Sequence, residues 1–219
     1  MRVVTFDAAG TLIRLVRPPG VIYAEVAQLF GFSLDPDRVQ KAFRSTWGTF
    51  APPTEFAGPV PDDDREWWRG LVVRTMEVAG YRIEPFDDYF KTVYQFFARP
   101  GVWELWPDVP LVMTELTRLK IRLGVISNFD RRLYEIFAHL GIRETFEHVI
   151  ISSEIGVRKP AARIFKEAAQ RFDVNVSEIL HVGDEFESDF AGARAAGLDA
   201  LLVDHKESKL PRILSFLGH

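Results

Sequence analysis

Short apolar segments recur along the chain and alternate with stretches of helical periodicity. The segments expected to be strands are residues 2–6, 121–126, 148–151, 179–182 and 200–203. Each is rich in β-branched residues, mostly apolar on both faces, and bounded by a turn or helical pattern. A strand that is apolar on both faces is typical of a sheet covered by helices on each side. The pattern therefore predicts an α/β fold with a buried parallel sheet and crossover helices.

The helices expected between the later strands are marked by apolar residues at 3.6-residue spacing. The supporting stripes are Val109, Val112, Leu116 and Leu119, then Leu133, Ile136, Phe137 and Leu140, and finally Ile164, Phe165, Ala168, Ala169 and Phe172. A helix of small residues is expected over Ala191–Ala196, stopped by Gly197. These helices supply the crossovers that a parallel sheet needs.

The segment between the first and second expected strands follows a different pattern. Residues 20–100 contain no convincing buried strand, and they are dense in aromatic residues. Helical stretches are expected near 20–31, 36–48, 63–79 and 85–98. We therefore expect an all-helical insert after the first strand.

Composition narrows the class of protein. The 219 residues are 47% hydrophobic and 26% charged, which suits one folded domain or two small ones. Lys and Arg total 27 against 31 Asp and Glu, so the net charge of −4 gives no general basic surface for nucleic acid. The absence of cysteine excludes disulfides, thiolate catalysis and zinc–thiolate sites.

Targeting signals are also not expected. No apolar run reaches the roughly 18 residues of a membrane span, and the start MRVVTFD lacks the features of a signal peptide. We expect a soluble, cytoplasmic protein without a membrane or nucleic-acid partner, either a monomer or a homodimer.

Polar residues follow the expected strands at the edge where a parallel sheet gathers functional groups. Asp7 follows the first strand, Ser127-Asn128 the second and Asp184 the fourth, while Lys159 lies in the loop after the third. Two aspartates can hold Mg²⁺, which prefers oxygen ligands. A lysine and a hydroxyl can orient a phosphate dianion, and an aspartate in line with phosphorus can attack it. Together these residues indicate Mg²⁺-assisted phosphoryl chemistry.

Four motifs make the chain resemble the haloacid dehalogenase (HAD) superfamily. They are Asp7-Ala8-Ala9-Gly10-Thr11-Leu12, Val125-Ile126-Ser127-Asn128, Arg158-Lys159-Pro160, and Gly183-Asp184-Glu185-Phe186-Glu187-Ser188-Asp189. Each motif alone is weak, but the set in this order is specific. The insert after the first motif resembles the helical cap of one subfamily. The resemblance implies a three-layer, Rossmann-like core of residues 1–14 and 107–219, with a mobile cap of residues 15–106 over the site.

The resemblance also implies a role for each matching residue. Asp7 would be the nucleophile and a metal ligand, and Lys159 would pair with Asp7 and with phosphate. Asp184 would bind Mg²⁺ together with the Ala9 carbonyl, and Asp189 would be a direct or water-mediated ligand. Thr11 would steady the first loop. The remaining positions implied to line the substrate phosphate are Ala8, Ala9, Ser127, Asn128 and Lys159.

One position departs from the family pattern. Phosphatases of the superfamily usually carry a second aspartate two residues after the nucleophile, where this chain has Ala9. General acid–base help is worth about 10²–10⁴-fold, so alkyl phosphates should react slowly. Three hypotheses follow: a Mg²⁺-dependent phosphohydrolase for a small phosphorylated metabolite with a good leaving group; a dehalogenase- or phosphonatase-like carbon-centred hydrolase; or a vestigial protein that binds a phosphorylated ligand or a partner.

The motif residues also have purely structural interpretations. Asp7 could cap a turn, Lys159 could be a solvated loop charge, and Asp189 could cap a helix over Phe190–Ala196. Ser127-Asn128 could be an N-cap pair. His181 lies inside the fourth expected strand, where a structural role is expected.

Overall fold

The computed structural model describes residues 1–50, 64–204 and 211–216 of the chain. These residues form two compact units. The sheet unit contains residues 1–14, 104–204 and 211–216, and the helical unit contains residues 15–50 and 64–103. No helix among the described residues combines the length and the apolar character needed to cross a bilayer.

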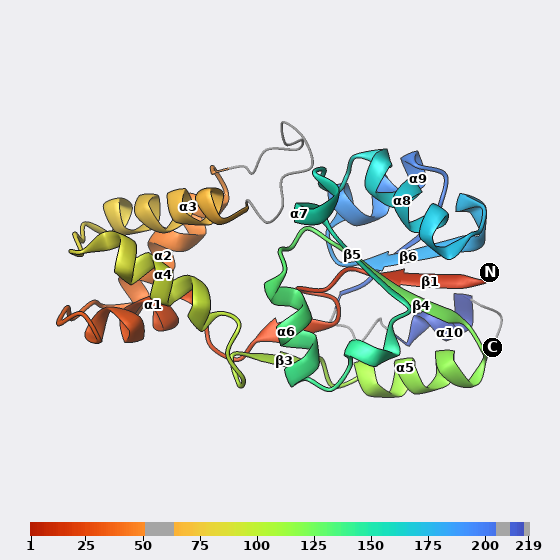
Figure 1. Ribbon diagram of the computed structural model, residues 1–219, viewed down its shortest axis with the longest axis horizontal. Coiled ribbons are helices and arrows are strands. Elements are labelled where there is room, and N and C mark those ends of the chain that lie inside the picture. Colours follow the sequence, from red (N-terminus) through yellow and green to blue (C-terminus); the bar gives the residue numbers. More distant parts are fainter. Residues whose placement is uncertain (51–63, 205–210, 217–219) are drawn as a thin grey trace. The chain divides into compact units, whose positions relative to one another are not determined.

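The sheet unit is built on five parallel strands, as predicted (Figure 1). Their order across the sheet is β5-β4-β1-β6-β7. The bounds are β1 Val3–Phe6, β4 Arg122–Ser127, β5 His148–Ile151, β6 Ile179–Gly183 and β7 Asp199–Leu202. Each observed strand agrees with an expected segment to within one residue at either end, because two-sided burial demands the continuous apolar runs that identified them.

Strand β1 lies at the centre of the sheet. Val3–Phe6 pairs with residues 122–125 of β4 on one side and residues 179–182 of β6 on the other. All of its residues are buried. The backbone N–H of Asp7 continues the ladder by donating to the Val182 carbonyl at 2.8 Å. The central position of β1 therefore delivers Asp7 to the middle of the sheet's carboxyl edge.

Helices cover both faces of the sheet and make three layers (Figure 1). Helices α8 (Ala162–Phe172) and α9 (Gly192–Ala195) lie on one face, and α5 (Val109–Arg118) and α10 (Arg212–Phe216) lie on the other. Phe165 and Phe172 of α8 pack with residues of β1, β4 and β5 in one apolar cluster. The shorter connections include α6 (Arg132–His139), α7 (Ser152–Ile155) and two 3₁₀ turns, Arg143–Thr145 and Val176–Glu178.

The segment after β6 differs from the sequence prediction. Instead of one helix over Ala191–Ala196, a π-helical turn covers Phe186–Ala191 and α9 covers Gly192–Ala195. The backbone N–H groups of Asp189 and Phe190 both donate to the Glu185 carbonyl, at 3.0 and 3.3 Å. Asp189 lies within this wide turn, and its side chain is buried in the interior. Single π turns of this kind often occur at functional sites.

The helical unit contains α1 (Pro19–Gln28), α2 (Pro36–Trp47), α3 (Asp64–Ala79) and α4 (Phe86–Phe96), close to the four predicted stretches. Helix α2 begins at a well-formed cap, where the Asp35 carboxylate accepts from the N–H groups of Asp37 and Arg38. The buried Tyr89 hydroxyl donates to the Tyr23 carbonyl at 3.1 Å. The helical unit thus has its own core. The expectation that this unit acts as a cap over the site stays a prediction.

A two-stranded sheet that the sequence patterns did not indicate lies where the chain passes between the units. It pairs β2 (Ile13–Leu15) with β3 (Trp103–Leu105). The Arg14 guanidinium donates to the Glu104 carboxylate at 2.7 Å. Strands of three residues are too short for alternation to show in the sequence, which explains why they were missed.

Candidate active site

The predicted motif residues converge at the carboxyl edge of the central strands. Asp7 follows β1, Ser127 is the last residue of β4, and Asp184 follows β6. Lys159 reaches the same place from the loop between α7 and α8, and Asp189 from the π turn. Parallel strands present their ends at one edge, which is why residues 182 positions apart in sequence become neighbours.

Asp7 is held by two donors at one oxygen. Ser127 Oγ donates to Asp7 Oδ1 at 3.0 Å, and Lys159 Nζ donates to the same oxygen at 2.6 Å. The ammonium also binds Asp189 Oδ1 at 2.6 Å. Lys159 is only 4% exposed. The interpretation of Lys159 as a solvated loop charge is therefore wrong. That of Asp189 as a helix cap is also wrong, because Asp189 lies inside the π turn and α9 begins after Ala191 without a side-chain cap.

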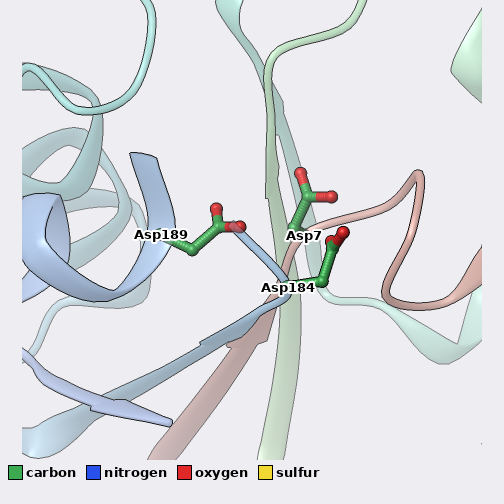
Figure 2. Close-up of side chains that lie close together, drawn as sticks. All are labelled: Asp7, Asp184 and Asp189. Atoms are coloured by element: carbon green, nitrogen blue, oxygen red, sulfur yellow. The ribbon is translucent and has the colours of Figure 1, made fainter. Parts of the chain in front are cut away.

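Three carboxylates could hold a metal ion. One oxygen from each of Asp7, Asp184 and Asp189 lies within 4.8 Å of the other two, and Figure 2 shows the three side chains gathered around a common space. Oxygen ligands of this kind suit Mg²⁺, which is bound by carboxylates and retained waters. Lys159 supplies one positive charge against these three carboxylates, so the donor set fits a divalent cation.

Burial and mutual repulsion shape the ionisation of the three acids. Burial raises the pKa of Asp7 to about 7, because the opposing Lys159 charge is shared with Asp189 while both other carboxylates repel. Burial also raises the pKa of Asp184, partly offset by the Thr11 hydrogen bond. Burial acts on Asp189 in the same direction, but Lys159 and His181 together bring its pKa below the ordinary value. A bound cation would favour the ionised form of all three.

Two glycines create the room in which the acids meet. A Cβ at Gly10, where φ is +98°, would lie 2.3 Å from Asp184 Oδ2. A Cβ at Gly183 would lie 2.2 Å from Asp189 Cγ. Side-chain atoms at these distances would overlap, so both positions require glycine for close approach.

The first loop is folded around the Ala8 carbonyl, which accepts from the N–H groups of Leu12 and Ile13 at 2.8 and 2.9 Å. Ala8 is buried, whereas Ala9 is exposed. Thr11 Oγ1 donates to Asp184 Oδ1 at 2.8 Å, so this loop residue contacts a candidate metal ligand. Metal coordination by Ala9 and phosphate binding by Ala8 and Ala9 stay predictions.

The side chain of Asn128 has a role that the sequence did not indicate. Its Nδ2 donates to the Lys159 carbonyl at 3.0 Å, and its Oδ1 accepts from the Lys159 N–H at 2.8 Å. This reciprocal pair fixes the backbone of Lys159, 31 residues away. The amide is thus engaged in holding the lysine, while phosphate binding by the Asn128 backbone stays a prediction. Sequence carries no local signal for such a distant pairing.

His181 is the second residue whose contacts were missed. Its Nε2 lies 3.3 Å from Asp189 Oδ1, and its Nδ1 lies 3.0 Å from Thr5 Oγ1. The ring is fully buried. Burial lowers the pKa of His181, so the neutral imidazole is favoured. One signal was available in the sequence, namely a polar residue inside an otherwise apolar strand.

The chain is similar in sequence to one protein family and to several known proteins. A family model described as "haloacid dehalogenase-like hydrolase" matches residues 1–197. The mouse (Mus musculus) protein "Haloacid dehalogenase-like hydrolase domain-containing protein 3" is 34% identical over 212 residues, covering 94% of this chain and 83% of that protein. "Glyceraldehyde 3-phosphate phosphatase" of Methanopyrus kandleri is 39% identical over 94 residues, covering 42% of this chain and 40% of its own.

Solved structures show the same fold. The putative HAD-hydrolase YfnB from Bacillus subtilis, bound to magnesium, has a TM-score of 0.75 at 17% identity and covers 100% of this chain and 99% of its own. L-2-haloacid dehalogenase from Xanthobacter autotrophicus has a TM-score of 0.73 at 20% identity, covering 98% of this chain and 83% of its own. A shared fold does not determine the reaction, so the reaction must be argued from the site.

Proposed function

The chain belongs to the haloacid dehalogenase-like hydrolase family, and we propose that it is a Mg²⁺-dependent phosphohydrolase that uses Asp7 as its nucleophile. The substrate is a small phosphorylated molecule with a good leaving group. The observation that carries the proposal is the contact set of Asp7: a hydroxyl and an ammonium at one oxygen, with two further carboxylates nearby.

The proposed reaction has two displacements. An oxygen of Asp7 attacks phosphorus, the bond from phosphorus to the leaving oxygen breaks, and an aspartyl-phosphate forms. Water then attacks this phosphorus and releases phosphate and the free carboxylate. Ser127 and Lys159, which hold Asp7 in this structure, would donate to the phosphoryl oxygens during both displacements.

The proposed metal ligands are Asp7, Asp184, Asp189 and the Ala9 carbonyl. Mg²⁺ at this site would reduce the repulsion between the attacking carboxylate and the phosphate dianion. Two observations support this assignment: the proximity of the three carboxylates, and the magnesium bound to the structurally similar YfnB. Thr11 keeps Asp184 oriented through its hydrogen bond.

Ala9 determines which substrates react well. Its methyl group cannot protonate a leaving oxygen or activate water. Acyl and aryl phosphates release weakly basic oxygens that need little protonation, so the proposal favours these over alkyl phosphates. The phosphatase from Methanopyrus kandleri supports phosphoryl chemistry among related sequences.

A carbon-centred hydrolase is the second candidate, because Ala9 also lacks the carboxyl typical of the phosphatases. The close approach of Asp184 and Asp189 to Asp7 argues for a metal and hence for phosphoryl transfer. Halide release from 2-haloacids in EDTA would establish the carbon-centred reaction. Phosphate release from a phosphate-ester panel that depends on Mg²⁺ would establish the proposed one.

The decisive variant is Asp7→Asn, which preserves shape and removes the nucleophile. We expect hydrolysis of acetyl phosphate and p-nitrophenyl phosphate to disappear, while calorimetry still detects inorganic phosphate binding in the presence of Mg²⁺. Asp199→Asn is the matched control, because Asp199 begins β7 at the opposite edge of the sheet and pairs with Arg194. Retained turnover in Asp7→Asn would reject Asp7 as the nucleophile.

A further inference from the structure

A continuous polar path leads from the sheet interior to the nucleophile. Thr5 Oγ1 contacts His181 Nδ1 at 3.0 Å, His181 Nε2 contacts Asp189 Oδ1 at 3.3 Å, and that oxygen accepts from Lys159 Nζ at 2.6 Å. The exposed fractions of Thr5 and His181 are both 0%. Lys159 completes the path by binding Asp7.

Thr5 and His181 are paired across neighbouring strands. They are direct register partners in the parallel β1–β6 ladder. Both interrupt strands that are otherwise apolar and buried. A buried polar group without a partner costs about 1–3 kcal/mol, so an apolar pair would be the simpler way to fill this space. Their mutual contact points to a role beyond filling the core.

The hydrogen-bonding capacity of its two partners indicates which ring nitrogen of His181 carries the proton. An ionised carboxylate only accepts hydrogen bonds, so contact with Asp189 requires a proton on His181 Nε2. The Nδ1 atom of the neutral ring is then an acceptor, and the Thr5 hydroxyl is its donor. The positions of the two partners, Asp189 Oδ1 facing Nε2 and the Thr5 hydroxyl facing Nδ1, support this assignment.

Asp189 is therefore held at both oxygens. Its Oδ1 accepts from Lys159 and faces His181, while its Oδ2 accepts from the backbone N–H of Glu185 at 3.0 Å. We propose that Thr5 and His181 are positioning residues for the reaction: Thr5 holds the ring as the Nε2–H tautomer, and the ring orients Asp189 against Lys159. The kinetic part of this inference rests on the proposed function.

Two substitutions of His181 separate positioning from packing. His181→Gln retains an N–H donor near the position of Nε2, whereas His181→Phe retains a ring beside Phe165 but no donor. Loss of a group that orients a metal ligand typically costs 10–100-fold in metal affinity or activity. We expect His181→Phe to lower kcat for p-nitrophenyl phosphate by about 10-fold or more with little change in KM, and His181→Gln to restore most of it.

A control variant and a second substitution, at Thr5, test whether a loss of activity reflects unfolding rather than lost positioning. His148→Gln is the matched control, because His148 begins β5 and its ring packs against Phe172, away from the three acids. Thr5→Val removes the hydroxyl while keeping a β-branched strand residue of the same shape. We expect Thr5→Val to lower kcat in the same direction as His181→Phe while thermal unfolding stays cooperative.

Two readouts do not depend on turnover. Nitrogen-15 spectra of the histidine rings should show a protonated Nε2 and an unprotonated Nδ1 for His181; loss of the signal in His181→Gln assigns it. Calorimetric titration with Mg²⁺ should show affinity about 10-fold or more weaker in His181→Phe than in the wild type.

The outcomes distinguish this inference from the proposed function. An Nδ1–H tautomer in the wild type, or Mg²⁺ affinity in His181→Phe equal to that of the wild type, overturns the positioning role whether or not the protein hydrolyses phosphate esters. Equal reduction of kcat in His181→Gln and His181→Phe also overturns it, since the donor would then be irrelevant. A wild type without phosphatase activity but with the expected tautomer and Mg²⁺ effect rejects the proposed function alone.

Discussion

Ala9 is the position at which the site lacks an acidic side chain, although the other expected side chains are assembled there. Lys159 and the three acids, among them the proposed nucleophile Asp7, lie together, while the position two residues beyond Asp7 carries only an exposed methyl group. Its exposure means that a larger side chain can be accommodated there without displacing the core. The site therefore has the parts for attack on phosphorus and lacks a built-in acid for the leaving group.

Replacing Ala9 with aspartate should supply that acid. We expect Ala9→Asp to raise kcat on alkyl phosphates by about 10-fold or more, within the 10²–10⁴-fold range of general acid–base catalysis. The effect on acetyl phosphate should be much smaller, because its leaving group needs no proton. Ala9→Asn is the control of equal size. Equal gains on both substrates, or equal gains in both variants, would contradict the explanation.

Gly10 offers a test of how tightly the acids are arranged. Alanine there adds backbone strain and places its Cβ 2.3 Å from Asp184 Oδ2, so we expect Gly10→Ala to lower Mg²⁺ affinity and activity together. In Gly101→Ala the φ of +77° gives comparable strain, but the Cβ meets no atom of the described chain within 4 Å. That control should lose about 1 kcal/mol of stability and keep its Mg²⁺ affinity by calorimetry.

Single residues differ in how far sequence reveals them. Asp7, Ser127, Lys159 and Asp184 were found because each lies in a motif next to a recognisable strand, and the structure brings them together. The contacts of Asn128 and His181 were not found, because their partners lie 31 and 8 residues away and depend on tertiary folding. A local pattern identifies a residue type but not the atom that it will face.

At the scale of elements, Arg122 ties three parts of the sheet unit together. From β4 it donates to the Glu147 carboxylate just before β5, with Nε to Oε2 at 2.8 Å. It also donates to the carbonyl of Phe172 at the end of α8 and lies over that ring. The hydrogen bond from Arg122 lowers the pKa of Glu147 below its ordinary value.

This link should make stability depend on pH in a definite direction. Because the pKa of Glu147 is lower in the folded protein, its contribution is present above about pH 4.5 and is lost as the pH falls through the folded-state pKa. We expect Glu147→Gln to reduce the free energy of unfolding by about 0.5–1 kcal/mol at pH 7, since the pair is partly exposed. Urea denaturation should show this difference shrinking below pH 4.5; a constant difference would assign it to packing.

The elements also show where prediction from sequence stops. The buried strands were located to within one residue because their apolar runs have no alternative interpretation in a covered sheet. The π turn over Phe186–Ala191 was not predicted, and the expected helix began only at Ala191, since a wide turn has the same composition as a narrow one. Strands β2 and β3 were missed because pairing, not pattern, defines strands of three residues.

At the scale of the whole molecule, a cation held by Asp7, Asp184 and Asp189, as proposed, should stabilise the folded state. A ligand that binds only the folded state adds about 2.7 kcal/mol at 100 times its Kd. For a protein of this size, saturating Mg²⁺ should raise the unfolding temperature by roughly 5–10 °C relative to EDTA in scanning calorimetry. Absence of any shift would argue against a site formed by these three carboxylates.

Asp184→Asn provides the control for that measurement. Burial raises the pKa of Asp184, so ionising this carboxyl is less favourable in the folded protein than in the unfolded chain. The neutral amide should therefore leave the EDTA-treated protein as stable as the wild type or more so, while abolishing the Mg²⁺-dependent shift. A loss of stability in EDTA would show that the hydrogen bond with Thr11 outweighs the electrostatic cost.

The pairing of β2 with β3 has an evolutionary consequence. Because these strands hydrogen-bond to each other, the segment between them begins and ends at adjacent positions in the folded structure. Chain that leaves and rejoins a fold at neighbouring points can be lengthened, shortened or exchanged with little disturbance to its host. A lineage carrying this scaffold could thus exchange the helical unit while leaving Asp7, Asp184 and Asp189 of the sheet unit in place.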